Sequence, residues 1–148
     1  MAISTKRGDE GLTDLADGSR VPKSHPKIVL SGKIDTLVAY LALVKLIAKD
    51  QSELICDIQK YLMRLIIDFE STDLELLTRL ENQITDSKIE KGWSYPAVNL
   101  KSAIINIARV TTRELEVLLV TNNVKNSISV INRLSDYLFV LYKNFEAN

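Results

Sequence analysis

Cysteine and histidine are almost absent from this sequence of 148 residues, which contains one of each, Cys56 and His25. A single cysteine excludes a disulfide framework within one chain. Its apolar neighbours Leu54 and Ile55 favour a small buried side chain over a reactive thiol. A lone histidine in a proline-flanked loop predicts a surface position. It gives no basis for a histidine metal cluster or for a serine or cysteine nucleophile activated by histidine.

Excess charge of one sign is also lacking, because nineteen basic residues balance nineteen acidic ones. This balance argues against binding to nucleic acid or to an anionic membrane, although a local cluster could still bind an anion. Lysine interrupts apolar runs such as residues 40–44 long before membrane-spanning length, and residues 1–11 are polar rather than apolar. We therefore expect a cytoplasmic protein without nucleic-acid or membrane partners.

Glycine and proline are scarce and unevenly placed. Residues 1–33 hold four of the five glycines and two of the three prolines, which is typical of loops. The 46% hydrophobic content of the chain is enough for one sizeable core. We expect a single domain over residues 1–148, in which residues 1–33 form a glycine-containing loop segment and residues 34–148 form a helical bundle.

Helical periodicity dominates after residue 33, and strand-like alternation is almost absent. Apolar residues at helical spacing, with candidate caps and breaks between them, predict five helices. Their approximate ranges are 35–49, 52–69, 74–85, 99–120 and 125–145. The expected fold is all-α, an antiparallel five-helix bundle.

The fourth helix carries charges among apolar residues. Its expected core face consists of Ile104, Ile107, Ala108, Leu115, Leu118 and Leu119. Arg109, Arg113 and Glu116 fall on the opposite side, with Ile105, Val110, Val117 and Val120 beside them. Such a face predicts contact with another surface or with a ligand, and Arg109 and Arg113 have the spacing to grip a polyphosphate. Ion pairs within the helix or between subunits are the alternative.

The N-terminal segment around Gly8 and Gly11 offers flexible backbone amides, cations and hydroxyl groups. Its polar residues are Thr5, Lys6, Arg7, Asp9, Glu10 and Thr13, followed later by Arg20 and Lys23. These groups are suited to binding phosphate. The glycine spacing is not that of a Walker A loop and no strand precedes it, so a mobile polar terminus remains the alternative.

Three segments together resemble the PduO-type ATP:cob(I)alamin adenosyltransferases over nearly the whole chain. They are Thr5-Lys6-x-Gly8-Asp9-x-Gly11-x-Thr13, Arg20-Val21-x-Lys23 followed by Gly32-x-x-Asp35, and Asn132-Arg133-Leu134-Ser135-Asp136-Tyr137-Leu138-Phe139. The resemblance implies a five-helix bundle that assembles as a homotrimer with ATP bound between subunits. It also implies transfer of the 5′-deoxyadenosyl group of ATP to cob(I)alamin, with release of triphosphate. ATP, Mg²⁺ and cobalamin would be the ligands, and an electron-donating reductase or a cobalamin-dependent enzyme a further partner.

The resemblance also implies residue roles. The ATP-binding residues would be Thr5, Lys6, Gly8, Asp9, Thr13, Lys23, Arg113, Glu116 and Asn132. Asp35 and Arg109 would form ion pairs at the subunit interface, and Trp93 would lie below the corrin ring. Arg113 and Trp93 would position the reactants, and no residue would act as a nucleophile.

This chain departs from the pattern of the family near the expected site. Glu114 and Val117 stand where the family typically has arginine, and Thr36 stands where it has glutamate. Trp93 replaces a phenylalanine, and residues 95–98 replace a Leu-Pro-Gly-Gly turn. Three functions therefore stay open: an adenosyltransferase with a modified site, a non-catalytic ATP- or cobalamin-binding relative acting as sensor, carrier or assembly partner, and a plain helical interaction module.

Overall fold

Three of the described helices begin where a side chain accepts a hydrogen bond from a free backbone amide. In the computed structural model, which describes residues 4, 6–87, 89 and 98–147, Asp73 Oδ1 accepts a hydrogen bond from the Leu76 amide at 2.9 Å. Asn99 and Ser102 form a reciprocal capping box at the start of the fourth helix. Both starts were predicted from the sequence.

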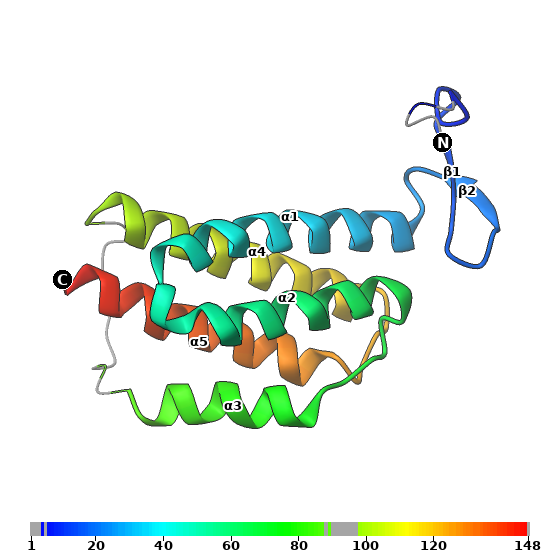
Figure 1. The fold of residues 1–148 in the computed structure, drawn as a ribbon. Helices are drawn as coiled ribbons and strands as arrows, with labels where there is room; N and C mark the ends of the chain where they lie inside the picture. Colours follow the sequence, from blue (N-terminus) through cyan, green and yellow to red (C-terminus); the bar gives the residue numbers. More distant parts are fainter. Residues whose placement is uncertain (1–3, 5, 88, 90–97, 148) are drawn as a thin grey trace.

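Five helices and a short hairpin make up the described structure (Figure 1). The elements are β1 (Leu12–Asp14), β2 (Arg20–Pro22), α1 (Pro26–Ile47), the 3₁₀ helix η1 (Lys49–Gln51), α2 (Ser52–Ile67), α3 (Leu74–Thr85), α4 (Leu100–Thr121) and α5 (Ile128–Glu146). The predicted five-helix bundle is confirmed. None of the described helices is long and apolar enough to cross a membrane.

Two features of the N-terminal part were not predicted. Helix α1 begins at Pro26 rather than near Asp35, because proline suits the first helical position, where no amide donor is needed, and His25 Nδ1 accepts from the Lys27 amide at 3.2 Å. Strands β1 and β2 pair antiparallel, with Thr13 opposite Val21. This hairpin projects beyond the end of the bundle at which α1 begins (Figure 1).

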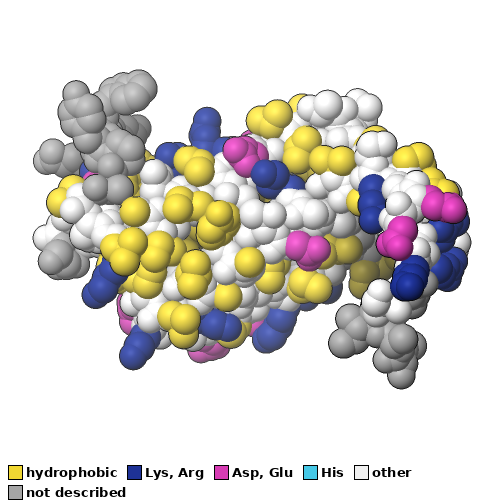
Figure 2. All heavy atoms as spheres, turned by 90° about the horizontal axis from the view of Figure 1, so that it is seen from above, with side chains coloured by type: hydrophobic (Ala, Val, Ile, Leu, Met, Phe, Trp, Pro, Cys, Tyr) yellow, Lys and Arg dark blue, Asp and Glu magenta, His cyan; other side chains and the backbone are white. Residues whose placement is uncertain are grey.

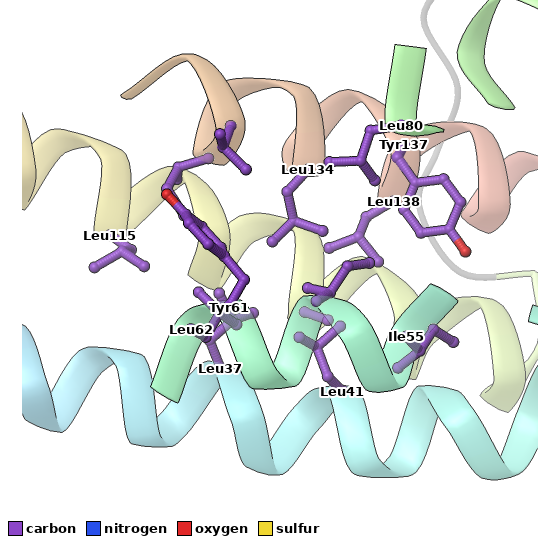
Figure 3. Close-up of a cluster of buried hydrophobic side chains, with 14 of the residues drawn as sticks. Leu37, Leu41, Ile55, Tyr61, Leu62, Leu80, Leu115, Leu134, Tyr137 and Leu138 are labelled. Atoms are coloured by element: carbon purple, nitrogen blue, oxygen red, sulfur yellow. The ribbon is translucent and has the colours of Figure 1, made fainter. Parts of the chain in front are cut away.

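The core lies between α1, α2, α4 and α5, and α3 packs against α5 (Figures 1 and 3). Among the described residues, three tyrosines are buried in it with their hydroxyl groups hydrogen-bonded, and two of them, Tyr61 and Tyr137, bond to residues distant in the sequence or outside their own helix. Tyr61 Oη donates to the Ser71 carbonyl at 3.0 Å, and Tyr137 Oη lies 3.2 Å from Gln51 Oε1. Burial raises the pKa of both tyrosines above the ordinary value, so both stay neutral hydroxyl donors.

The buried face of α4 is rotated relative to the prediction. Its buried residues are Ser102, Ile105, Ala108, Thr111, Thr112, Leu115 and Leu119. Ile105 was placed beside the charges but is fully buried, whereas Ile107, expected in the core, is 41% exposed. Burial of threonine was not predicted. Thr112 is buried without leaving its hydroxyl group unsatisfied, because its Oγ1 donates a hydrogen bond to the Ala108 carbonyl at 2.8 Å.

Truncation of a core leucine tests this arrangement. Leu41 on α1 is fully buried, so we expect Leu41→Ala to lower the free energy of unfolding by about 2–5 kcal/mol. Leu74 on α3 is 70% exposed, so Leu74→Ala should change the free energy of unfolding by less than about 0.5 kcal/mol. Urea unfolding at one fixed protein concentration, followed by circular dichroism, measures both. Equal losses would contradict the placement of Leu41.

Candidate functional site

A groove of about 980 Å³ runs along the exposed side of α4 and is called the α4 groove below. Its lining residues are Lys33 from α1, Asn132 from α5, and Val110, Arg113, Glu114, Glu116, Val117, Leu118, Val120 and Thr121 from α4. Three helices that are distant in sequence therefore contribute polar side chains to one depression.

Three of the residues predicted to bind nucleotide meet in this groove. Arg113 and Glu116 are one turn apart on α4, and Asn132 projects from α5. Asn132 Nδ2 donates to Glu116 Oε1 at 3.0 Å, which orients the carboxylate and leaves the second Nδ2 hydrogen of Asn132 as a donor for a ligand. Arg113 is exposed, and among the described residues no hydrogen bond or ion pair holds its guanidinium group. The arrangement offers one cation and one fixed amide to an incoming anion.

Arg109 does not join Arg113 in the groove, so the two arginines do not form a clamp there. The Nε atom of Arg109 donates to Asn106 Oδ1 at 2.8 Å, and its guanidinium carbon lies 6.0 Å from the centre of the Phe139 ring. Partial burial, together with the charge of Arg113, lowers the pKa of Arg109 below its ordinary value. Arginine remains charged at neutral pH even so. Arg109 therefore links α4 to α5 within the chain.

Lys33 lines the groove but was not among the residues predicted from the sequence to form a site. Its Nζ atom lies 2.7 Å from Glu114 Oε2, and the pair joins α1 to α4. The two residues are 81 positions apart, so no local pattern points to their contact. Glu114 therefore faces a cation of its own chain. Asp35, by comparison, is exposed on α1 and does not line the groove.

One wall of the groove is apolar and exposed. Val110, Val117 and Val120 on α4 have exposed fractions of 39%, 64% and 55%. Figure 2, which views the molecule from above Figure 1, shows hydrophobic side chains gathered on this side of the bundle with charged ones among them. The prediction that the charged side of α4 is not a plain solvated face is consistent with this arrangement.

The remaining predicted phosphate-binding residues lie in the N-terminal arm, defined here as residues 6–23. Lys6 has a φ of 59°, and the Lys23 amide donates to the Gly11 carbonyl at 2.9 Å. A Cβ atom on Gly8 would lie 3.1 Å from Lys23 Nζ, so the ammonium group occupies the space that a side chain would fill. The arm thus brings Lys6, Gly8, Asp9 and Lys23 into one turn region.

Within a single chain, the arm and the α4 groove are separate. Arm residues Lys6, Gly8, Asp9, Thr13 and Lys23 are absent from the groove lining. Arg7 and Arg20 both form ion pairs with Asp14, at 3.1 and 3.3 Å. These ion pairs stabilise the arm and involve no residue of the bundle. Thr5 and Trp93, also predicted as site residues, lie outside the described residues.

Comparison with known proteins decides the family. The family model described as cobalamin adenosyltransferase matches residues 3–144. The chain belongs to the cobalamin adenosyltransferase family. It is 33% identical to a corrinoid adenosyltransferase of Citrobacter freundii over 93% of this chain and 90% of that protein. It is 30% identical to a cobalamin adenosyltransferase of Cupriavidus metallidurans over 94% of this chain and 85% of that protein.

Solved structures show the same fold for this family. A variant PduO-type ATP:corrinoid adenosyltransferase from Lactobacillus reuteri, complexed with cobalamin and ATP, superposes with a TM-score of 0.84 at 24% identity, covering 97% of this chain and 91% of that one. Another variant of this type of enzyme from the same organism, complexed with ATP, gives 0.88 at 22% identity, covering 99% and 94%. The bundle with its N-terminal hairpin is therefore the fold of PduO-type enzymes.

The different surroundings of the two arginines predict different effects on stability. Arg109→Met removes a hydrogen bond and a ring contact, and we expect it to lower the free energy of unfolding by about 1 kcal/mol. Arg113→Met removes an exposed guanidinium group and should change the free energy of unfolding by less than about 0.5 kcal/mol. Urea unfolding of the two variants side by side measures both. A larger loss for Arg113→Met would contradict the placement of Arg109.

Proposed function

We propose that the protein is an ATP:cob(I)alamin adenosyltransferase, which transfers the 5′-deoxyadenosyl group of ATP to cobalt and releases triphosphate. The observation that carries the proposal is the convergence of Arg113, Glu116 and Asn132 in the α4 groove of a chain of this family. These are the residues of the long helix and the last helix for which the family resemblance implied ATP binding.

The reaction needs little acid–base chemistry from the protein. The electron pair of cobalt(I) forms a bond to the 5′ carbon of ATP, the bond from that carbon to the triphosphate oxygen breaks, and the triphosphate leaves with the electron pair. Because the corrinoid supplies the nucleophile, no activated serine, cysteine or histidine is required. The residues of the chain would bind and orient the nucleotide and balance the charge of the leaving group, with Arg113 supplying charge and Asn132 a hydrogen bond.

The N-terminal arm would complete the nucleotide site from a neighbouring subunit. The arm residues proposed to contact ATP are Lys6, Gly8, Asp9, Thr13 and Lys23, together with Thr5, which precedes the arm in the sequence. The arm projects away from the bundle, so one chain does not bring it to its own groove (Figure 1). The exposed valines of the α4 groove give a second subunit an apolar surface to cover. A homotrimer with shared sites, in which Asp35 and Arg109 contribute to the interface, accounts for both features.

Magnesium would enter with the nucleotide. The described residues contain no cluster of three metal-binding side chains, but Mg²⁺ bound to a nucleotide commonly needs only one or two carboxylates besides phosphates and water. Glu116 is a carboxylate fixed within the groove, so the residues present fit such an ion. Bound Mg²⁺ would supply positive charge to the triphosphate.

The corrinoid is proposed to contact Trp93, whose aromatic ring would keep the lower axial position of cobalt free of ligands. An electron-donating reductase or a cobalamin-dependent enzyme is the expected protein partner. The cytoplasmic location inferred from the sequence stays a prediction.

A non-catalytic relative that binds ATP or cobalamin is the second candidate. The observation that favours it is the composition of the groove, where Glu114 and Val117 leave Arg113 as the one arginine in the lining. In that case the protein would act as a sensor, carrier or assembly partner.

The activity assay separates the two candidates. We expect the purified protein, incubated with ATP, Mg²⁺ and chemically reduced cobalamin, to give the visible spectrum of a cobalt–carbon product, together with stoichiometric triphosphate. Omission of ATP is the control. Nucleotide binding without product would support the non-catalytic candidate, and absence of both ATP and cobalamin binding would exclude both.

Complementation between two defective chains tests the shared site. Lys6→Ala damages the arm and Asn132→Ala damages the groove, so each variant alone should have little activity. Co-expressed chains would form some sites from one intact arm and one intact groove, and random assembly predicts recovery of about a quarter of wild-type activity. If arm and groove of the same chain formed the site, no site would be intact and the mixture would stay inactive.

A further inference from the structure

We propose that Lys33 is a phosphate-binding residue of the α4 groove and that Glu114 holds its ammonium group in place until ATP enters. This inference rests on the proposed function, because it names a further contact for the nucleotide. It adds a residue of α1 to a site otherwise built from α4 and α5 within one chain.

The charge of the groove leads to this inference. Its lining carries two cations, Lys33 and Arg113, and two carboxylates, Glu114 and Glu116. A triphosphate brings several negative charges, and without Lys33 the groove itself would offer it one arginine beside two carboxylates. Arg109 is not available for this task, since its guanidinium group is engaged with Asn106 and Phe139. Lys33 is therefore the second cation that a bound triphosphate can reach within this part of the chain.

The geometry of the ion pair fits an exchange of partners. Lys33 Nζ lies 2.7 Å from Glu114 Oε2, with the lysine side chain 29% exposed and the glutamate side chain 61% exposed. An ion pair whose carboxylate is this exposed contributes little to stability, because water competes with the lysine for the carboxylate. A triphosphate carries more charge than one carboxylate and can take over the ammonium group. Glu114 would then turn outward into solvent.

A purely structural ion pair between α1 and α4 is the competing explanation, and the two explanations predict different signs. If the pair only tied the helices together, loss of either partner would act on ATP affinity in the same direction. If Lys33 binds phosphate, loss of the lysine weakens ATP binding. Loss of the Glu114 charge then strengthens it, because a competing and repelling anion disappears.

The test compares Lys33→Gln, Lys33→Arg and Glu114→Gln in the full-length protein. Isothermal titration with ATP and with inorganic tripolyphosphate gives the dissociation constants, and the KM for ATP is measured in the adenosylation assay. We expect Lys33→Gln to raise the dissociation constant about ten-fold. Lys33→Arg should keep most of the affinity, and Glu114→Gln should lower the dissociation constant about three-fold. Arg113→Ala should weaken ATP binding more than Glu114→Ala does.

The chain offers a matched control. Lys60 pairs with Asp57 on α2 at 2.9 Å, so Lys60→Gln makes the same change of charge and breaks a comparable ion pair outside the groove. It should leave ATP affinity unchanged. The effects of the Lys33 and Glu114 variants should also shrink at high salt, where exposed charges are screened.

Each outcome decides the matter. Unchanged ATP affinity in Lys33→Gln, or weakened affinity in Glu114→Gln, overturns the role of Lys33 while an active wild-type protein keeps the proposed function. Absence of ATP binding by the wild-type protein overturns both. If thermal melting shows that Lys33→Gln does not fold, Glu114→Gln decides alone: tighter binding supports the proposal, and unchanged or weaker binding overturns it.

Discussion

The packing of α4 between α1 and α5 is the constraint on which the site depends. Ile105, Ala108, Leu115 and Leu119 bury one face of the helix, and this burial fixes its rotation about its own axis. Once the rotation is fixed, Arg113 and Glu116 must open toward the groove, while Arg109 must turn toward α5. If the buried face of α4 were shifted by one residue, different side chains would face the groove and α5. The positions of the α4 charges in the groove therefore follow from apolar contacts on the other side of this helix.

Much of this architecture is readable from the sequence, because it depends on local signals. Asp73 and Asn99 are good caps, and each starts a helix where it was predicted. Pro26 was predicted to lie in a loop, although proline is also typical of a first helical turn. The predicted start of α1 is therefore later than the observed one. The hairpin was missed because strands of three residues are too short to show alternation.

The candidate site was predictable only where motifs or helical spacing identified it. Arg113, Glu116 and Asn132 were chosen from motif positions, and they meet in one groove. Lys33 was not chosen, because its role depends on a contact between α1 and α4 that has no local signature. The orientation of Arg109 was missed for a related reason. Helical spacing places Arg109 near Arg113, but a ring on α5 decides where the guanidinium group lies.

The folded N-terminal arm has a consequence for the speed and strength of ligand binding. The hydrogen bond from the Lys23 amide to the Gly11 carbonyl and the ion pairs of Arg7 and Arg20 with Asp14 all lie within the arm itself. An incoming anion would thus meet a pre-organised set of cations, and little of its binding free energy would be consumed in ordering that segment. If the arm binds ATP as proposed, binding would need modest local adjustment rather than folding of the arm.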